Sequence, residues 1–223
     1  MKRAIVSGAI LASGFVGSPQ AHSGARPVEL RESKMMIEYT VDSTDAAIVV
    51  STEAETHLAR VEVRNPLGQP VLEVRSERGS EFGFQGFVVD SGESTPTELF
   101  AEYPPGDYTI RARTTDGRTA VGTARFSHAL PRPPRVLYPS NGMVDVPTTD
   151  LEVSWTADAA VDSYRVSLEQ HETDVMTVIV RSGTGSFQVP DGVLESGTRS
   201  RLEIGAIGAD GNCTVVQVPF LTR

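Results

Sequence analysis

The sequence predicts an all-β protein built from two tandem β-sandwich domains of immunoglobulin-like type. Short runs of alternating apolar and polar residues recur between turn residues, which is typical of sandwiches and barrels. The 20 glycines and 14 prolines are spread along the chain at short intervals, and helical periodicity is nearly absent after the first residues. A length of 223 residues accommodates two such domains.

The first 25 residues have the layout of a secretory signal peptide. Two basic residues precede an apolar run that ends near Val16, and small residues follow. The apolar run is too short and too rich in glycine for a membrane span. Small residues place cleavage after Ala21 or Ala25. We therefore expect export to the periplasm or beyond, with no membrane span once this segment is removed.

Charge and cysteine content restrict the partners and the compartment further. The formal net charge is −9 and the isoelectric point lies near 5.0, which disfavours nucleic acid because phosphate binding needs a clustered positive field. Cys213 is the one cysteine of the chain, so an exported form has no internal disulfide and depends on its hydrophobic core. We expect Cys213 to be a small, buried strand residue.

The first predicted domain covers residues 30–130. Residues 46–51 form a compact apolar run, and residues 59–63 and 71–74 flank a proline- and glycine-containing loop, which predicts a hairpin. The segment 82–89 is rich in phenylalanine and glycine. Two interpretations stay open for it: Phe82, Phe84 and Val88 belong to the core, or the aromatic residues, Phe84 and Phe87 among them, form a ligand-binding surface.

The stretch GDYTIRARTTDGRTAVGTARF predicts the clearest hairpin of this domain. Tyr108, Ile110 and Ala112 share one face of the first strand, and Arg111 and Arg113 share the other. A period of two turns the first set inward and the arginines toward water. The two arginines are accordingly candidates for binding a partner, beside the simpler interpretation that they belong to a solvated strand face.

The turn and the return strand of this hairpin carry their own signals. The pair Asp116-Gly117 supplies the positive φ that a tight hairpin turn needs. On the return strand Val121, Ala124 and Phe126 break strict alternation. We expect a β-bulge at Gly122 to restore it.

A proline-rich linker, residues 131–135, separates the two predicted domains. The second domain covers residues 136–223 and contains seven short alternating or β-branched segments, a number typical of an immunoglobulin-like sandwich. These segments begin near Val136, Leu151, Tyr164, Val175, Phe187, Leu202 and Val216.

The second domain resembles a fibronectin type III domain in the order and position of its motifs. The matching segments are Leu151-Glu152-Val153-Ser154-Trp155, Tyr164-Arg165-Val166-Ser167-Leu168, Leu194-Glu195-Ser196-Gly197-Thr198 and the ending Phe220-Leu221-Thr222. One departure is Ser200, which stands where the family usually has a tyrosine that ties down a corner loop. The corner hydrogen bond must be lost or made differently, and the loop is expected to be looser.

A shorter echo of this corner occurs in the first domain, where Tyr108 follows Pro105-Gly106. Together the layout resembles bacterial exported proteins that contain a fibronectin type III domain. Such domains serve as spacers, adhesion modules or attachments to enzymes. The resemblance therefore implies binding or structure and supplies no active site.

No catalytic motif emerges from the chain. The histidines lack the spacing of a zinc site, no Gly-x-Ser-x-Gly elbow occurs, and residues 182–186 form a Ser/Gly turn without an identifiable base. Asp210-Gly211-Asn212 and the acids between positions 90 and 98 lack the spacing of a calcium loop. We expect a non-catalytic module without a cofactor, binding a protein or glycan in the envelope or outside the cell. A carbohydrate- or calcium-dependent binding module is the alternative, and a small hydrolase is a weaker one.

Overall fold

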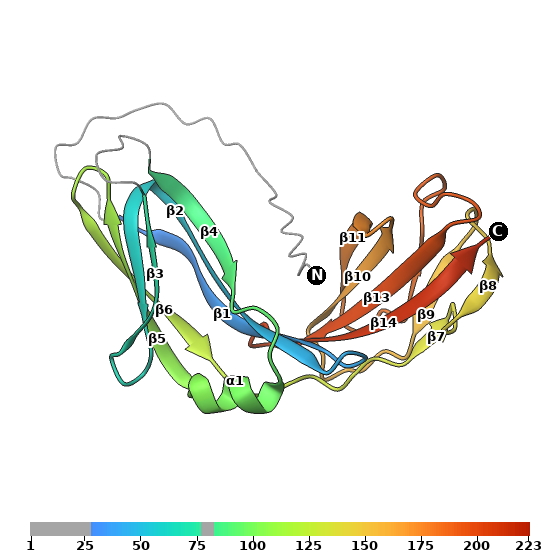
Figure 1. Ribbon diagram of the computed structural model, residues 1–223, viewed down its shortest axis with the longest axis horizontal. Helices are drawn as coiled ribbons and strands as arrows, with labels where there is room; N and C mark the ends of the chain where they lie inside the picture. Colours follow the sequence, from blue (N-terminus) through green and yellow to red (C-terminus); the bar gives the residue numbers. More distant parts are fainter. Residues whose placement is uncertain (1–27, 77–82) are drawn as a thin grey trace. The chain divides into compact units, whose positions relative to one another are not determined.

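The computed structural model describes residues 28–76 and 83–223, and the described chain is almost entirely β (Figure 1). The prediction of an all-β protein with immunoglobulin-like sandwich sheets is confirmed. The chain divides into two compact units. Among the described residues, unit 1 comprises those up to Met35 together with 50–76, 83–89 and 106–125, and unit 2 comprises 36–49, 90–105 and 126–223.

Unit 1 is organised around β2, the longest described strand. Its central strands follow the order β1-β2-β5-β6, and β3 and β4 also pair with β2. The strands are β1 (Leu30–Thr40), β2 (Asp45–Arg64), β3 (Pro70–Arg75), β4 (Phe84–Asp90), β5 (Gly106–Thr114) and β6 (Thr119–Phe126). The part of β1 after Met35 and the part of β2 before Val50 belong to unit 2. The predicted β2–β3 hairpin is confirmed, and its loop is held by Asn65, whose side-chain oxygen accepts hydrogen bonds from the N–H groups of Leu67 (3.0 Å) and Gln69 (2.9 Å).

Alternation decides which side of the β5–β6 hairpin is buried. Tyr108 and Ile110 are fully buried, as predicted, and Gly117 takes the turn with φ +87°. The expected bulge at Gly122 is wrong, because Val121 points outward and is 66% exposed. Gly122 follows the regular alternation and lies on the inward side of β6. A Cβ at this position would lie only 2.4 Å from the Ser33 hydroxyl, so the absence of a side chain provides room for β1.

Unit 2 contains a sandwich of two sheets. One sheet has the order β11-β10-β13-β14 and the other β12-β9-β7. All seven predicted segments are strands, and a short β8 is added: β7 (Val136–Tyr138), β8 (Met143–Val146), β9 (Glu152–Trp155), β10 (Ser163–Gln170), β11 (Thr173–Arg181), β12 (Ser186–Gln188), β13 (Arg199–Ile207) and β14 (Cys213–Thr222). The Trp155 and Tyr164 rings, 5.5 Å apart, join the two sheets in the core.

The sheet of unit 2 is extended by chain from the N-terminal half of the sequence. The later part of β1 runs parallel to β14, with Glu38 opposite Cys213 and Thr40 opposite Val215. The buried side chain of Asn212 fixes this pairing, because its oxygen accepts a hydrogen bond from the Ile37 N–H (2.8 Å). The domain division at residues 131–135 stays a prediction.

One helix among the described residues was not anticipated by sequence reasoning. Helix α1 (Pro96–Glu102) begins at Thr95, whose side chain accepts a hydrogen bond from the Glu98 N–H, while the Glu98 carboxylate accepts one from the Thr95 N–H. This capping box, with Pro96 at the first helical position, is a local signal that was available in the sequence. None of the described helices has the length and apolar character needed to cross a bilayer.

Candidate binding surface

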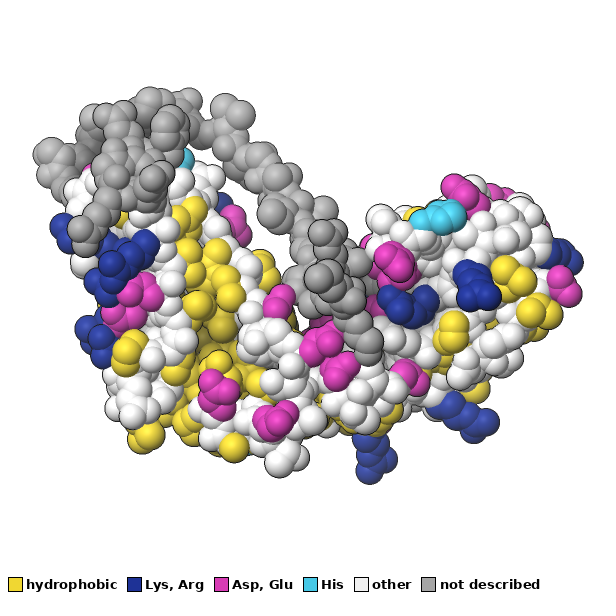
Figure 2. Space-filling view, in the orientation of Figure 1, with side chains coloured by type: hydrophobic (Ala, Val, Ile, Leu, Met, Phe, Trp, Pro, Cys, Tyr) yellow, Lys and Arg dark blue, Asp and Glu magenta, His cyan; other side chains and the backbone are white. Residues whose placement is uncertain are grey.

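The predicted arginine pair lies on the solvent face of the sheet in unit 1. We call this surface the arginine face and define it by Arg60, Glu62 and Arg64 of β2, Glu73 and Arg75 of β3, and Arg111 and Arg113 of β5. The antiparallel registers align these residues in rows across the three strands. Figure 2 shows basic and acidic side chains interleaved along the margin of unit 1 where Figure 1 draws β3 and β5.

The first row contains three arginines. Arg60 on β2 is opposite Arg75 on β3 and opposite Arg113 on β5. Like charges placed side by side on one face repel each other unless acids lie between them. The row is therefore a concentration of positive charge that the neighbouring row has to compensate.

The second row supplies the acids. Glu62 is opposite Glu73 on one side and Arg111 on the other. Glu62 accepts a hydrogen bond from Arg60 (2.8 Å) and one from Arg64, and Glu73 pairs with Arg75 and Arg60. The hydrogen bond from Arg75 is the main reason that the pKa of the exposed Glu73 is lowered. Both glutamates are thus engaged by the arginines of β2 and β3.

Arg111 and Arg113 are left over from this pairing. Both side chains are exposed, and within the described part of the chain neither makes a hydrogen bond or an ion pair. By contrast Arg118, in the adjoining turn, is held 2.8 Å from Asp116, and its hydrogen bond is the main cause that lowers the pKa of Asp116 to about 2. Arg111 and Arg113 are therefore the two charges of the arginine face that no acid among the described residues compensates.

The predicted aromatic pair comes from a different strand. Phe84 and Phe87 lie on β4, half-buried, with ring centroids 6.3 Å apart in an edge-to-face arrangement. Between them Gly86 packs directly on β2, because a Cβ there would come within 2.8 Å of the Thr52 carbonyl oxygen. Half-burial places Phe84 and Phe87 partly in the core and leaves part of each ring exposed. Val88 is 52% exposed, so it does not belong to the core, and Phe82 lies outside the described residues.

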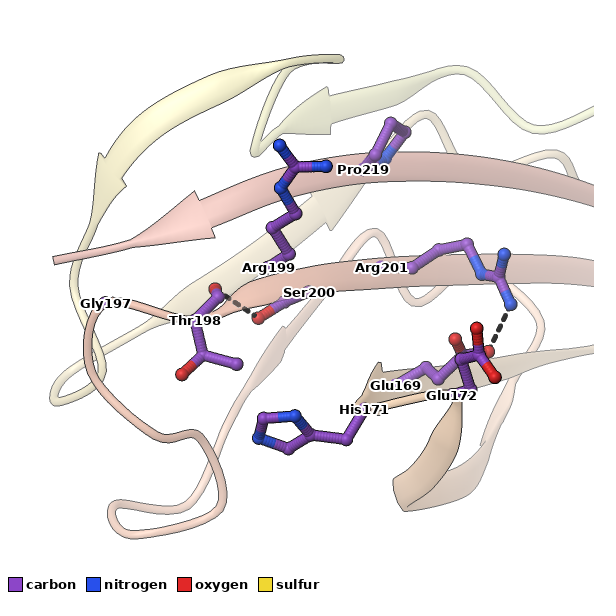
Figure 3. Close-up of a pocket in the computed structure, with 9 residues that line it drawn as sticks. All are labelled: Glu169, His171, Glu172, Gly197, Thr198, Arg199, Ser200, Arg201 and Pro219. Atoms are coloured by element: carbon purple, nitrogen blue, oxygen red, sulfur yellow. Dashed lines mark hydrogen bonds and ion pairs between the residues drawn. The ribbon is translucent and has the colours of Figure 1, made fainter.

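A shallow hollow of about 470 Å³ lies on unit 2 (Figure 3). It is formed by the start of β13, the turn between β10 and β11, and one residue of β14. Its lining consists of Glu169, His171, Glu172, Gly197, Thr198, Arg199, Ser200, Arg201 and Pro219. Sequence reasoning did not single out this place, because its members come from three separate segments of the chain.

Arg201, His171 and Ser200 of the hollow are each engaged by another protein group. Arg201 pairs with Glu169, and the His171 ring lies 3.2 Å from Glu195. The Ser200 hydroxyl donates to the Thr198 carbonyl (3.2 Å) and accepts from the Gln170 amide (2.8 Å). Figure 3 shows Arg199 extending toward Pro219 and away from His171. The two partners of the Ser200 hydroxyl, a backbone carbonyl and a side-chain amide, are not bases that activate a nucleophile.

The same contacts correct the expectation of a loose corner loop at Ser200. Gln170 accepts a hydrogen bond from the Glu195 N–H (2.9 Å) and donates one to the Glu195 carbonyl (3.2 Å). The Thr222 hydroxyl also donates to this carbonyl (2.6 Å) and accepts a bond from the Thr198 N–H (2.9 Å). Gln170, Ser200 and Thr222 therefore anchor this corner loop.

A partly buried charge cluster on the outer face of the unit 2 sheet was also missed. The Arg165 guanidinium on β10 reaches Glu38 on β1 at 2.7 Å. Its path is open because Gly205 lies between them, with an ideal Cβ position 2.7 Å from the Cys213 sulfur and 3.6 Å from the Arg165 Cβ. Burial lowers the pKa of Arg165, but the hydrogen bond and charge of Glu38 outweigh it and the pKa is raised.

Cys213 and Glu203 complete this cluster. Cys213 is 4% exposed, which confirms the expectation of a buried strand residue. Burial raises the pKa of its thiol to about 12, and it also raises the pKa of Glu203 more than the nearby Arg201 and Arg165 lower it. The cluster is a set of charges balanced among themselves, and it favours a structural role.

The acidic turns are occupied by protein groups. Asp210 accepts hydrogen bonds from the Ser127 hydroxyl and the Asn212 N–H, and the Asn212 amide donates to the carbonyls of Ser127 (3.0 Å) and Ala129 (2.8 Å). Glu98 caps α1. Among the described residues, no group of three or more His, Cys, Asp or Glu side chains is arranged to hold a metal ion.

No family model matches the sequence, and no curated protein matches it. Solved structures with partial similarity include the fibronectin(III)-like modules of Clostridium thermocellum CbhA, at 12% identity and a TM-score of 0.36, covering 88% of this chain and 94% of that one. A two-domain fibronectin type III segment of chicken tenascin has 14% identity and a TM-score of 0.31, covering 87% and 97%. A tetra-tandem repeat from a large adhesion protein has 19% identity and a TM-score of 0.32, covering 86% and 50%. Scores of this size establish no function for the chain.

Proposed function

We propose that this protein is an exported, non-catalytic β-sandwich protein that binds another protein through the arginine face of unit 1. The observation that carries the proposal is the state of Arg111 and Arg113, which are exposed and have no partner among the described residues. Both are fixed on a paired strand whose opposite face is buried, so little backbone freedom is lost on binding. Arginine is enriched in protein–protein interfaces, where its planar fork matches carboxylates.

The chemistry of the face indicates an acidic patch on the partner. Arg60, Arg64 and Arg75 already share Glu62 and Glu73, so an incoming carboxylate gains most from Arg111 and Arg113. The chain as a whole carries a net charge of −9, so the attraction is local. Over a Debye length of about 8 Å at physiological salt, neighbouring positive charges act together while the distant acids are screened.

An affinity capture experiment tests this proposal. The chain recovered from the expressing cell is immobilised and exposed to envelope and secreted fractions of the source organism. The double variant R111A/R113A is expected to lose a specifically captured protein. The matched control R132A/R135A removes two exposed arginines from residues 131–135 of unit 2 and is expected to retain it. Equal capture by both variants, or no captured protein with the unchanged chain, contradicts the proposal.

Export is tested separately. N-terminal sequencing of the chain recovered from the periplasm or the medium is expected to start after Ala21 or Ala25. A chain recovered from the cytoplasm with its first residues intact removes export from the proposal and leaves the binding surface to be tested alone.

A further inference from the structure

The two edges of the β11-β10-β13-β14 sheet in unit 2 differ in how they are covered. At the β14 edge, β1 pairs along residues 213–215, the Asp42 carboxylate accepts a hydrogen bond from the Gln217 N–H (2.7 Å), and β8 pairs with Phe220 and Thr222. Successive parts of this edge are thus protected from another chain, which is how natural sheets avoid association through unpaired strands.

The β11 edge carries no such cover from the described residues (Figure 1). β11 pairs with β10 along one side, and its sequence TDVMTVIVR is mostly apolar and β-branched. Val175 is 40% exposed and Ile179 is 57% exposed. A long apolar edge strand with free backbone groups is a template for pairing with another strand.

Hydrogen bonding to β10 shows which backbone groups of β11 face the open edge. The Ser182 N–H donates to the Asp162 carbonyl (3.1 Å) in continuation of the β10–β11 register. In an antiparallel pair, successive residues direct their N–H and C=O groups to alternate sides. The N–H and C=O groups of Thr177 and Ile179 and the N–H group of Arg181 therefore point away from β10, while the Arg181 carbonyl accepts a hydrogen bond from the Thr184 N–H (3.2 Å).

An irregularity limits the length of strand that is able to pair. Leu168 is opposite Met176, whereas Glu169 is opposite Asp174, so Val175 is an extra residue on β11. Such a bulge bends the strand and interrupts regular pairing. The regular part of the open edge accordingly runs from Met176 to Arg181.

We propose that this segment pairs antiparallel with the same segment of a second copy of the chain, about a two-fold axis at Ile179. The interface is isologous, so each copy presents the same strand. In this register Ile179 lies opposite its twin, Thr177 lies opposite Arg181 of the other copy, and Val178 lies opposite Val180. Each residue and its partner in the other copy differ by an even number of positions, so their side chains lie on the same face of the combined sheet.

The choice of axis follows from the exposed side chains and the bulge. An axis at Ile179 buries the most exposed apolar side chain of β11 against its own copy and leaves Val175 outside the paired segment. An axis at Val178 instead places Ile179 opposite Thr177, so both isoleucines lose their apolar partner. The chosen register also brings Arg181 toward the Asp174 end of the other strand.

The association is weak and depends on concentration. The Ile179 pair supplies two backbone hydrogen bonds and each Thr177–Arg181 pair supplies one, about four in all, because the Arg181 carbonyl is held by the Thr184 N–H. The paired segment is far shorter than an interface of about 1,600 Å², the usual size for a stable complex. A covalent trap is therefore the sharper test, and sedimentation at high concentration complements it.

Disulfide trapping tests the register with the full chain as recovered from the expressing cell. Opposed Cα atoms in a hydrogen-bonded antiparallel pair are about 5.5 Å apart, within the range of a disulfide. I179C is expected to form a covalent dimer under mild oxidation, and T177C, which faces position 181 of the other copy, at least about tenfold more slowly. Cys213 is buried and does not compete. Equal rates for both variants, or no dimer with I179C, overturn the proposal.

Sedimentation equilibrium of the full chain without a new cysteine gives an independent readout. The unchanged chain is expected to show a concentration-dependent monomer–dimer equilibrium that I179K abolishes. V144K is the matched control, because Val144 is also 57% exposed but lies on β8. A monomer at all concentrations, or equal loss of dimer in both variants, contradicts the proposal.

Discussion

Arginines on the outer sheet faces of the two units differ in their exposure and in their hydrogen-bond partners. In unit 2, Arg165 is largely covered by its neighbours, and its guanidinium lies 2.7 Å from Glu38. In unit 1, Arg111 and Arg113 are exposed and have no partner in the described part of the chain. An arginine on a strand has a structural role where the fold places an acid beside it and shields it from water, as at Arg165. Where the fold does neither, as at Arg111 and Arg113, the side chain stays available for a partner.

The largest expected effect is the protection of Cys213, which lies beside the Arg165–Glu38 pair. Because the thiol is buried and its pKa is raised to about 12, it is neutral and inaccessible in the folded chain. If labelling requires global opening, a stability of at least about 5 kcal/mol slows the reaction with a disulfide reagent by more than about 10³-fold relative to the urea-unfolded chain. Rapid labelling of the native chain contradicts this burial.

The same thiol predicts a pH dependence. Its pKa in the folded chain, about 12, lies above the ordinary value of about 9, so the unfolded state loses its proton first as the pH rises. The contribution of Cys213 to stability is therefore complete below pH 9 and falls between pH 9 and about 12. C213A is expected to flatten this part of the curve of unfolding free energy against pH, and an unchanged slope contradicts the assignment.

Removal of the Arg165 side chain is the next largest effect. R165A leaves Glu38 without its charged hydrogen-bond donor, and we expect it to lower the free energy of unfolding by about 2 kcal/mol. The control is R125A, which breaks an ion pair to Asp107 at 3.0 Å between two well-exposed side chains. It is expected to cost about 0–0.5 kcal/mol. Similar urea midpoints for the two variants show that burial of the Arg165 pair has no energetic consequence.

Gln170, which anchors the corner loop, is expected to contribute slightly less to the free energy of unfolding than Arg165 does. Q170A removes a buried amide that bonds to both backbone groups of Glu195 and to the Ser200 hydroxyl, at a cost of about 1–2 kcal/mol. Q188A, at an exposed position with one bond to the Leu151 carbonyl, is the control. Hydrogen exchange in residues 195–198 is expected to accelerate in Q170A alone, and unchanged exchange there removes the anchoring role.

Local alternation explains what the sequence was able to predict. Tyr108, Ile110 and Ala112 turn inward because side chains repeat with period two, and the strands of unit 2 follow from the same rule. Val121 led to the wrong expectation of a bulge, because an exposed valine is indistinguishable by residue type from a buried one. Alternation also placed Arg111 and Arg113 in water but carried no information about their partners.

Contacts between distant segments account for what the sequence did not predict. Glu38 and Arg165 are 127 positions apart, and Asn212 bonds to Ile37 across 175 positions. No local pattern marks such pairs, because each member has an ordinary sequence environment. The hollow of unit 2 and the β1–β14 pairing belong to the same class. Helix α1 is different, because its capping box at Thr95 is a local sequence signal. The helix is short, and a segment of this length with polar residues is easily taken for a turn.

The smallest expected effect on stability separates a binding surface from a structural one. R111A/R113A is expected to change the free energy of unfolding by no more than about 0.5 kcal/mol, because exposed side chains without partners contribute little. Arg113 lies opposite Arg60, so removing its positive charge relieves a repulsion and allows a slight gain in stability. Loss of capture without loss of stability then assigns the two arginines to binding. A loss of stability comparable to that of R165A instead assigns them to the fold, and the arginine face no longer differs from the charge cluster of unit 2.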